Sequence, residues 1–330
     1  MVDHYSGYGH FSRCLAIANY FLKRHYDIIF LINNNSYLKK ELLKNNLNYS
    51  IISKFKTKSL EGKFLNKFIF ENYISCILID MREFSEVLSK EIDNSECLIV
   101  VIDDSSVTNV YSDILLNGTP IKQFHKYKKS NKKARLLVGS KYFLTNPEFA
   151  HNKKNLSEIK LKKKYDVVIS CGGSDLNELT WKISKQITSI PNIKIQVIVG
   201  PLMKQKSPNN IKKDVKIIHS PKKIWNIFKK ADLVICTSGS TLFELAIQGI
   251  PCINIAAVKH QTLYGTEFSD SGFGIYIGFW RKLNFSKFNS ITEKLLSNTS
   301  QRKRMSSVGK KLVDGNGLKR FEKVISTMIN

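Results

Sequence analysis

Acidic residues are scarce in this chain of 330 residues, which has 27 Asp and Glu against 52 Lys and Arg and a formal net charge of +25. Such a balance favours nucleic acid, an anionic membrane surface or an anionic substrate as a partner. However, the lysines occur in short separate runs, and aromatic residues do not interleave with them as a base-stacking surface requires. We therefore attribute most of the charge to compositional drift and predict no specific nucleic-acid partner.

Several patterns that indicate a cellular compartment are missing. The six cysteines form no CxxC pair and lie in or beside apolar runs, which indicates buried, reduced thiols rather than disulfides or a zinc site. No apolar run approaches the roughly 18 residues needed to cross a bilayer, and the N-terminal residues contain no signal-peptide core. We therefore expect a cytoplasmic protein without a transmembrane segment.

Patterns of three common chemistries are also absent. The sequence contains no Gly-x-Ser-x-Gly elbow, no Walker loop and no cluster of metal ligands. These absences argue against a serine hydrolase, a kinase and a metalloenzyme. We predict a site that uses neither a metal nor a cofactor.

The chain does contain a regular alternation of short β-branched runs and longer amphipathic segments, which is typical of parallel α/β sheets. Its length suits two domains of about 150 residues each. A polar, Lys-rich segment at 151–164 separates the two halves. We predict two Rossmann-like domains, 1–155 and 156–330, that face a central cleft. The expected strands are Asp27 to Ile32, Ile74 to Ile79, Cys97 to Ile102, Tyr165 to Ser170, Ile193 to Val199, Val215 to Ile218, Asp232 to Cys236 and Cys252 to Ile255.

The first motif is a glycine loop that opens a helix, from Ser6 to Leu15, with His10 directly after Gly9. Glycines let the backbone approach a ligand, and the free N–H groups of a helix start favour an anion. The positive helix end disfavours a protonated histidine, so His10 is a candidate general base. A plain turn with an exposed histidine explains the motif equally well.

The second motif is the end of a strand followed by Gly172, Gly173 and Ser174. A strand, a glycine loop and a helix start are the usual geometry for holding a phosphate. The alternative is a tight strand-to-helix turn in which Ser174 caps the next helix.

The third motif, Ser238-Gly239-Ser240-Thr241, again joins a strand to a helix. Its small side chains leave room for a diphosphate, and Glu244 follows one turn along, where a carboxylate could bind ribose hydroxyls. The alternative is local, because Thr241 and Glu244 match the spacing of a capping box.

Further carboxylates follow a first-half strand. Asp103 and Asp104 close the strand that ends at Ile102, and Asp113 and Asn117 come shortly afterwards. Adjacent residues on a strand point to opposite faces, so Asp103 and Asp104 are not expected to work as an acid/base pair.

Taken in order, these motifs resemble the UDP-2,4-diacetamido-2,4,6-trideoxy-β-L-altropyranose hydrolase family of the pseudaminic acid pathway. That family is related to the lipid-II-forming N-acetylglucosaminyltransferase, which has the GT-B fold. The resemblance spans about residues 3–275, and its order is more specific than any single motif. The matching stretches are Gly7 to His10, Arg13 to Leu15, Val101 to Asp104, Asp113 to Asn117, Tyr142 to Leu144, Glu148-Phe149, Lys163 to Asp166, Gly172 to Asp175, Ser238 to Thr241, Glu244, Gly249 to Pro251 and His260-Gln261.

The resemblance implies that His10 activates a water that displaces UDP from the anomeric carbon of a UDP-sugar, without a metal. It implies that the UDP is bound by Gly172, Gly173, Ser174, Ser238, Gly239, Ser240, Thr241 and Glu244, and that other substrate contacts come from Gly9, Arg13, Asp104 and Gln261. Fixed N–H dipoles would stabilise charge on the leaving diphosphate. The alternative is a GT-B glycosyltransferase that passes the sugar to an acceptor, for which the Lys-rich region 45–70 could supply a surface.

The chain departs from the family at two places. The family has a strand before its glycine loop, whereas this chain begins Met1-Val2-Asp3, so we expect the first strand of the N-terminal sheet to be nearly missing. The family also places Asp-His-Tyr after its third strand, whereas this chain reads Asp80-Met81-Arg82. The tyrosine that would line the sugar pocket is absent, which leaves the exact sugar open.

Overall fold

The structure is a computed structural model, and it describes residues 8–80, 86–92, 97–104, 111–127, 134–204, 207–208 and 215–329. The chain forms two compact units. The first comprises His10–Asn146 and the residues from Asn316 on, and the second comprises Pro147–Gly315 together with Gly7–Gly9. Residues 1–7, which bear on the expected missing strand, lie outside the described residues.

These units differ from the predicted domains at both ends of the second half. The division falls at Pro147 rather than after residue 155, and the last helix, α12 (Gly317–Ile329), belongs to the first unit. The physical reason is the apolar face of α12, whose Leu318, Phe321 and Val324 pack in one core with the strands of the first unit. Sequence periodicity showed that this face was apolar, but not which sheet would cover it.

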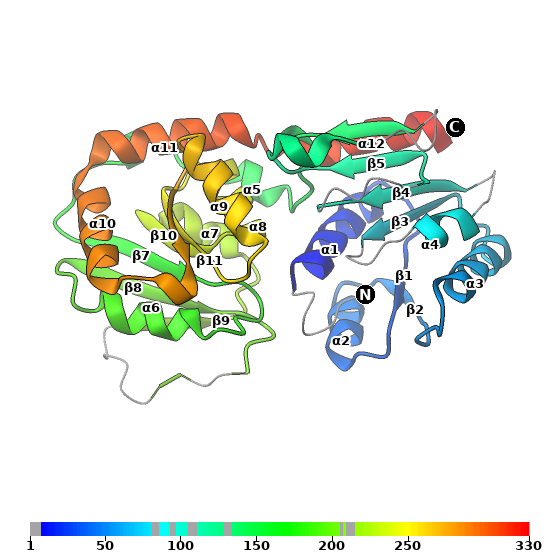
Figure 1. The fold of residues 1–330 in the computed structure, drawn as a ribbon, viewed down its shortest axis with the longest axis horizontal. Helices are drawn as coiled ribbons and strands as arrows, with labels where there is room; N and C mark the ends of the chain where they lie inside the picture. Colours follow the sequence, from blue (N-terminus) through cyan, green and yellow to red (C-terminus); the bar gives the residue numbers. More distant parts are fainter. Residues whose placement is uncertain are drawn as a thin grey trace. The chain divides into compact units, whose positions relative to one another are not determined.

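The first unit contains only parallel strand pairs in its described residues, arranged in two sheets with orders β1-β2 and β3-β4-β5-β6 (Figure 1). Its strands are β1 (Ile29–Ile32), β2 (Asn48–Ile51), β3 (Cys76–Asp80), β4 (Leu98–Ile102), β5 (Ile114–Asn117) and β6 (Arg135–Val138). Besides α12, its helices are α1 (Tyr8–Leu22), α2 (Ser36–Lys44), α3 (Lys58–Glu71) and α4 (Glu86–Glu91).

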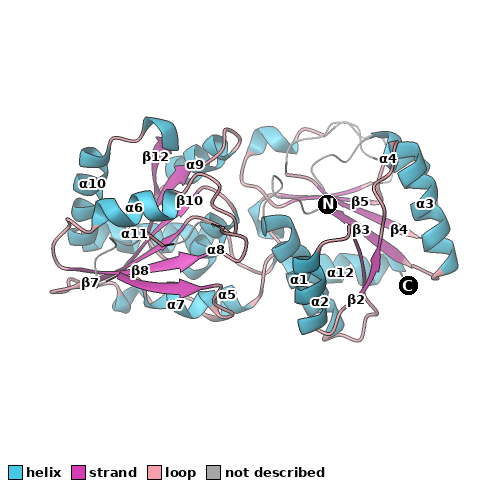
Figure 2. Cartoon of the chain, turned by 90° about the horizontal axis from the view of Figure 1, so that it is seen from below, coloured by secondary structure: helices cyan, strands magenta, loops and turns pink. Residues whose placement is uncertain are grey.

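Helices cover both faces of the four-stranded sheet (Figure 2). On one face, Ile17 and Phe21 of α1 pack with Val100 of β4, in the same core as α12. On the other face, Leu65 of α3 packs with Val101. Burial on both faces explains why β4 is an unbroken apolar run rather than an alternating one. It also fixes α1 beside the ends of β3 and β4.

The second unit is one parallel sheet of six strands with the order β12-β11-β10-β7-β8-β9. Its strands are β7 (Tyr165–Ser170), β8 (Ile193–Val199), β9 (Val215–His219), β10 (Leu233–Thr237), β11 (Cys252–Ala256) and β12 (Ile275–Phe279). Its helices are α5 (Glu148–His151), α6 (Leu179–Ile187), α7 (Ile224–Lys230), α8 (Ser240–Gln248), α9 (Gln261–Asp270), α10 (Phe285–Ser297) and α11 (Thr299–Leu312). The chain builds outward from β7 in one direction and then, from β10, in the other.

All eight expected strands are present, with ends within two residues of the prediction. The strands not anticipated are β2, β5, β6 and β12. Three of them have only four residues, and β2 is exposed at both of its ends. Among the described residues, no helix combines the length and apolar character needed to span a bilayer. The six cysteines are free thiols, of which four are buried.

Candidate active site

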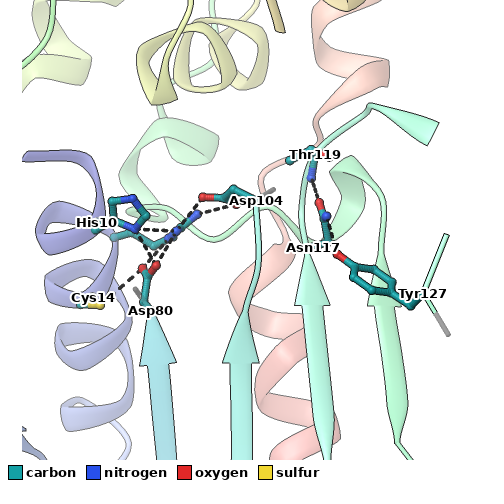
Figure 3. Close-up of polar contacts among 8 residues, drawn as sticks. His10, Cys14, Asp80, Asp104, Asn117, Thr119 and Tyr127 are labelled. Atoms are coloured by element: carbon teal, nitrogen blue, oxygen red, sulfur yellow. Dashed lines mark hydrogen bonds and ion pairs between the residues drawn. The ribbon is translucent and has the colours of Figure 1, made fainter. Parts of the chain in front are cut away.

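The candidate active site of the first unit lies where α1 passes the carboxyl ends of β3 and β4 (Figure 3). His10, in the first turn of α1, places Nδ1 2.7 Å from Oδ1 of Asp80, the last residue of β3. The Asp80 side chain is only 1% exposed, whereas that of His10 is 15% exposed. The histidine therefore has a buried carboxylate behind it and a ring that reaches solvent.

The distance between His10 and Asp80 determines which ring nitrogen carries the proton. Two lone pairs at 2.7 Å would repel each other, so Nδ1 must donate to the carboxylate. Arg13 Nη2 also lies 3.3 Å from Nδ1, but a protonated Nδ1 cannot accept, so that approach is a packing contact. The neutral ring then has its lone pair on Nε2. This is the arrangement in which a carboxylate orients a general base.

Asp80 stays ionised in spite of its burial. Burial alone would raise the pKa of this carboxyl, but the charge of the Arg13 guanidinium and hydrogen bonds from His10 and Arg13 outweigh it and hold the pKa well below its usual range. The thiol of Cys14 also donates to Asp80, over 3.6 Å. Burial and the nearby carboxylate raise the pKa of Cys14 well above the ordinary value, so this thiol is not a nucleophile at neutral pH.

Asp103 and Asp104 point in different directions, as predicted for neighbours at a strand end. Asp104 accepts two hydrogen bonds from Arg13, at 2.8 and 3.1 Å. Asp103 is buried and accepts from the hydroxyl of Tyr127 over 2.7 Å. Burial and the adjacent Asp103 raise the pKa of Tyr127, in spite of a hydrogen bond from Asn117 that lowers it.

Asn117 extends this second group of contacts across the ends of β4 and β5 (Figure 3). It is fully buried, donates to Tyr127 over 2.7 Å and accepts from the backbone N–H of Thr119 over 3.0 Å. These bonds hold the loop that follows β5. Asp113 instead accepts from the backbone N–H of Ile99, which is a structural role.

In the second unit, the two predicted nucleotide loops follow β7 and β10, which are adjacent strands. The strand order reverses direction between these two strands. In open parallel sheets, ligands bind beyond the carboxyl ends of the strands at such a reversal. The topology therefore brings together two loops that lie about 65 residues apart in the sequence.

The first of these loops depends on its glycines. Gly172 has a φ of +90°, which favours glycine. Gly200, at the end of β8, lies so close to the carbonyl groups of Gly172 and Gly173 that a Cβ at position 200 would collide with them. The carbonyl of Gly173 accepts from the backbone N–H of Leu202. The loop is thus held by main-chain contacts.

Asp175 caps the helix after this loop, so the alternative in which Ser174 caps that helix is wrong. Asp175 and Glu178 adopt left-handed backbone conformations, so α6 begins only at Leu179 and Ser174 is too far from its start. The Asp175 carboxylate accepts from the N–H groups of Leu179 and Thr180, at 3.0 and 2.7 Å. Burial raises the pKa of Asp175, although these hydrogen bonds oppose the rise.

The second loop leaves the start of α8 without a side-chain cap. The helix begins at Ser240 with Gly239 as N-cap, and Thr241 is already inside it, so the alternative capping box of Thr241 and Glu244 does not form. Ser238 is fully buried and its hydroxyl donates to Asn254 over 2.7 Å. The hydroxyl proton of Ser238 is therefore used within the loop.

Gln261, predicted as a substrate residue, opens α9 beside the second loop. Its Oε1 accepts from the backbone N–H of Ala257, and its Nε2 would lie 3.4 Å from a Cβ at Gly239. The predicted substrate residues thus divide between the units. His10, Arg13 and Asp104 come together in the first, and Gln261 belongs to the second.

Asp80 is the functional candidate that sequence reasoning missed. It was noted only as a departure from a family pattern, although it closes an apolar strand just as Asp103 and Asp104 close the next one. Carboxylates that end neighbouring parallel strands meet at one edge, and that signal could have found it. The described residues contain no group of three or more His, Cys, Asp and Glu side chains that could hold a metal.

Together, the two parallel α/β units, each with polar groups at the carboxyl edge of a sheet, define a GT-B-like α/β protein. The family model "Glycosyltransferase family 28 C-terminal domain" matches residues 136–321, which is more than half of the chain, and the chain belongs to this family. The family is glycosyltransferase-like.

Individual proteins resemble the chain over nearly its whole length. The spore coat polysaccharide biosynthesis protein SpsG of Bacillus subtilis is 24% identical over 98% of this chain and 95% of its own. The structure of MurG from Acinetobacter baumannii superposes with a TM-score of 0.71 at 13% identity, over 98% of this chain and 97% of that chain. The spinosyn rhamnosyltransferase SpnG complexed with thymidine diphosphate gives a TM-score of 0.65 at 14% identity, over 98% and 97% of the two chains.

Proposed function

We propose that the protein hydrolyses a UDP-linked sugar at its anomeric carbon and releases UDP. The observation that carries the proposal is the contact of 2.7 Å between His10 Nδ1 and Asp80 Oδ1, which leaves Nε2 as a proton acceptor. Family membership and the strand reversal beside the two loops of the second unit support a nucleotide-sugar substrate. The motif resemblance favours UDP and an amino-deoxy sugar of the pseudaminic acid pathway.

In the proposed reaction, Nε2 of His10 takes a proton from a water molecule as the water oxygen bonds to the anomeric carbon. The bond from that carbon to the β-phosphate oxygen breaks, and its electron pair stays on UDP. Asp80 stabilises the imidazolium that forms, and the ring then returns its proton to solvent. A direct displacement of this kind inverts the anomeric configuration.

The second unit would hold the leaving group. The N–H groups at the start of α8 have no side-chain cap, so they and the hydroxyl of Ser240 are candidates to bind the diphosphate as its charge grows. The motif resemblance assigns the ribose to Glu244. No step of this reaction requires a metal.

A glycosyltransferase reaction is the second candidate, and the family match favours it directly. The same His10 would take a proton from an acceptor hydroxyl rather than from water. The two reactions are distinguished by what receives the sugar. Release of UDP in buffer alone supports hydrolysis, whereas release that requires an acceptor supports transfer.

The test incubates the purified protein with UDP-linked diacetamido sugars, other UDP-sugars and matching dTDP-sugars, with and without acceptors, in ¹⁸O-water. We expect UDP release without an acceptor and no ¹⁸O in the UDP, because water attacks carbon and not phosphorus. His10→Asn should lower turnover by roughly 10² to 10⁴ with little change in UDP affinity. His25→Asn is the matched control, since His25 is exposed and has a φ of 64°, which asparagine tolerates. A His10→Asn rate within about tenfold of the wild type would remove His10 from the chemistry.

A further inference from the structure

Arg13 has almost no capacity left for a substrate. Its Nε and Nη2 donate to the two oxygens of Asp80 at 2.8 and 2.7 Å. Its Nη1 and Nη2 donate to the two oxygens of Asp104 at 3.1 and 2.8 Å. Four of the five N–H groups of a guanidinium are thereby used. The side chain is 12% exposed, so it lies between the carboxylates and not in front of them.

The position of Arg13 explains how two carboxylates can lie near a neutral base. Asp80 contacts the His10 ring directly, Asp104 lies on the other side of the guanidinium, and Cys14 contributes a thiol that donates to Asp80. The guanidinium charge offsets one of the two carboxylate charges beside the ring. Without Arg13 this offset is lost, and the histidine–carboxylate pair would hold an additional proton up to a higher pH.

That additional proton would disable the base if it settled on the ring or on the Asp80 oxygen that faces the ring. On the ring, it would give an imidazolium with Nε2 protonated. On Asp80, the new O–H would donate to Nδ1 and shift the ring proton to Nε2. Either form removes the Nε2 lone pair. Without Arg13, the orientation of the Asp80 carboxylate would also be lost, because the guanidinium fork fixes which Asp80 oxygen faces His10.

We propose that Arg13 is a positioning residue, which orients Asp80 toward His10 and offsets the carboxylate charge beside the ring, and that it does not bind the substrate. The effect on turnover rests on the proposed function, whereas the effect on His10 does not. The two can therefore be tested separately.

The first test follows the His10 ring by NMR during a pH titration of the full-length protein, with its signals assigned through His10→Asn. Arg13→Gln should move the midpoint of the ring titration upward by about one pH unit or more. Arg13→Lys keeps the charge and loses the fork, so its midpoint should move less. Arg24→Gln is the control from the turn that follows α1, because Arg24 pairs with Glu322 of α12. A folded Arg13→Gln variant with an unchanged midpoint would overturn the proposal.

The second test separates positioning from substrate binding by steady-state kinetics. For Arg13→Lys we expect kcat to fall by about tenfold or more with little change in KM, and the acidic limb of the rate profile to move to higher pH in Arg13→Gln. A large rise in KM at constant kcat and an unchanged pH profile would make Arg13 a substrate ligand and overturn the proposal. If Arg13→Gln does not fold, Arg13→Lys still tests the role of Arg13, through the NMR titration and through the separate effects on kcat and KM. If the ring titration shifts but the protein turns over no UDP-sugar, the role of Arg13 is supported and only the proposed function is refuted.

Discussion

Replacing Asp80 by Asn tests the core of the proposed mechanism. The two side chains have the same shape, but Asn presents one oxygen and one amide where Asp80 presents two acceptors to His10 and Arg13. If the Asn oxygen faces His10, the Asn NH2 group faces the N–H of Arg13 Nε, and one arm of the Arg13 fork is lost. In the opposite orientation the NH2 group faces Nδ1 of His10, and Nδ1 can no longer keep its proton.

The expected loss of activity follows from the change of tautomer. A general base contributes roughly 10² to 10⁴ in rate, and an Asp-to-Asn change behind a catalytic histidine reaches the upper end in hydrolases that use such a pair. We expect kcat to fall by about 10³ or more for Asp80→Asn. UDP affinity, measured by calorimetry, should stay within about threefold, because the predicted nucleotide residues belong to the other unit.

Stability should fall as well, because the substitution leaves Arg13 with one carboxylate. Breaking a buried ion pair costs about 3–5 kcal/mol, and the remaining partner Asp104 places the expected cost at the lower end. The pKa of Asp80 is held below its usual range, mainly by Arg13 acting against the effect of burial, so the carboxylate stabilises the fold above its unfolded pKa of about 3.9. The difference in unfolding free energy between Asp80→Asn and wild type should be constant from about pH 5 to 8 and shrink as the pH falls below about 4.

The matched control is Asp103→Asn, which changes a buried carboxylate at the end of the neighbouring strand. Asp103 accepts a hydrogen bond from the hydroxyl of Tyr127. None of the hydrogen bonds described above joins Asp103 to His10. We expect lower stability with the pH dependence of turnover retained. If Asp103→Asn and Asp80→Asn lowered kcat equally, with the same pH profile, the special role of Asp80 would be refuted.

Two further substitutions test the second unit. Glu244→Gln should lower UDP affinity by about tenfold, the size of one hydrogen bond to a charged group. A lower midpoint at full affinity, measured by calorimetry and thermal unfolding, would return Glu244 to a structural role. Asp175→Ala should cost about 1 kcal/mol through the lost cap of α6, and Asp175→Asn should recover only part of that loss, because both carboxylate oxygens accept from N–H groups and Asn keeps one acceptor. An Asp175→Asn variant as stable as the wild type, measured by urea unfolding, would show that one acceptor is enough for this cap.

Local features of the sequence predicted much of the architecture. Unbroken apolar runs such as 98–102 and 233–237 identified strands buried on both faces, and the structure confirms them. The order of the motifs indicated a GT-B-like protein, and the structural comparisons confirm that fold. The strands β2, β5 and β6 escaped because a short parallel strand is stabilised by its neighbours in the sheet and not by its own pattern.

Some residues of the candidate site could likewise be predicted from local sequence, whereas others depend on the tertiary structure. A glycine loop before a helix singled out His10, and short loops of small residues after strands singled out Gly172 and Ser240, because these arrangements need only a few consecutive residues. Asp80 lies 70 residues from His10, and only the packing of α1 against β3 brings them together. The same packing places Arg13 between two carboxylates. It was therefore the tertiary structure that decided the tautomer of His10 and the role of Arg13, since both depend on charges that lie far apart in the sequence and only angstroms apart in space.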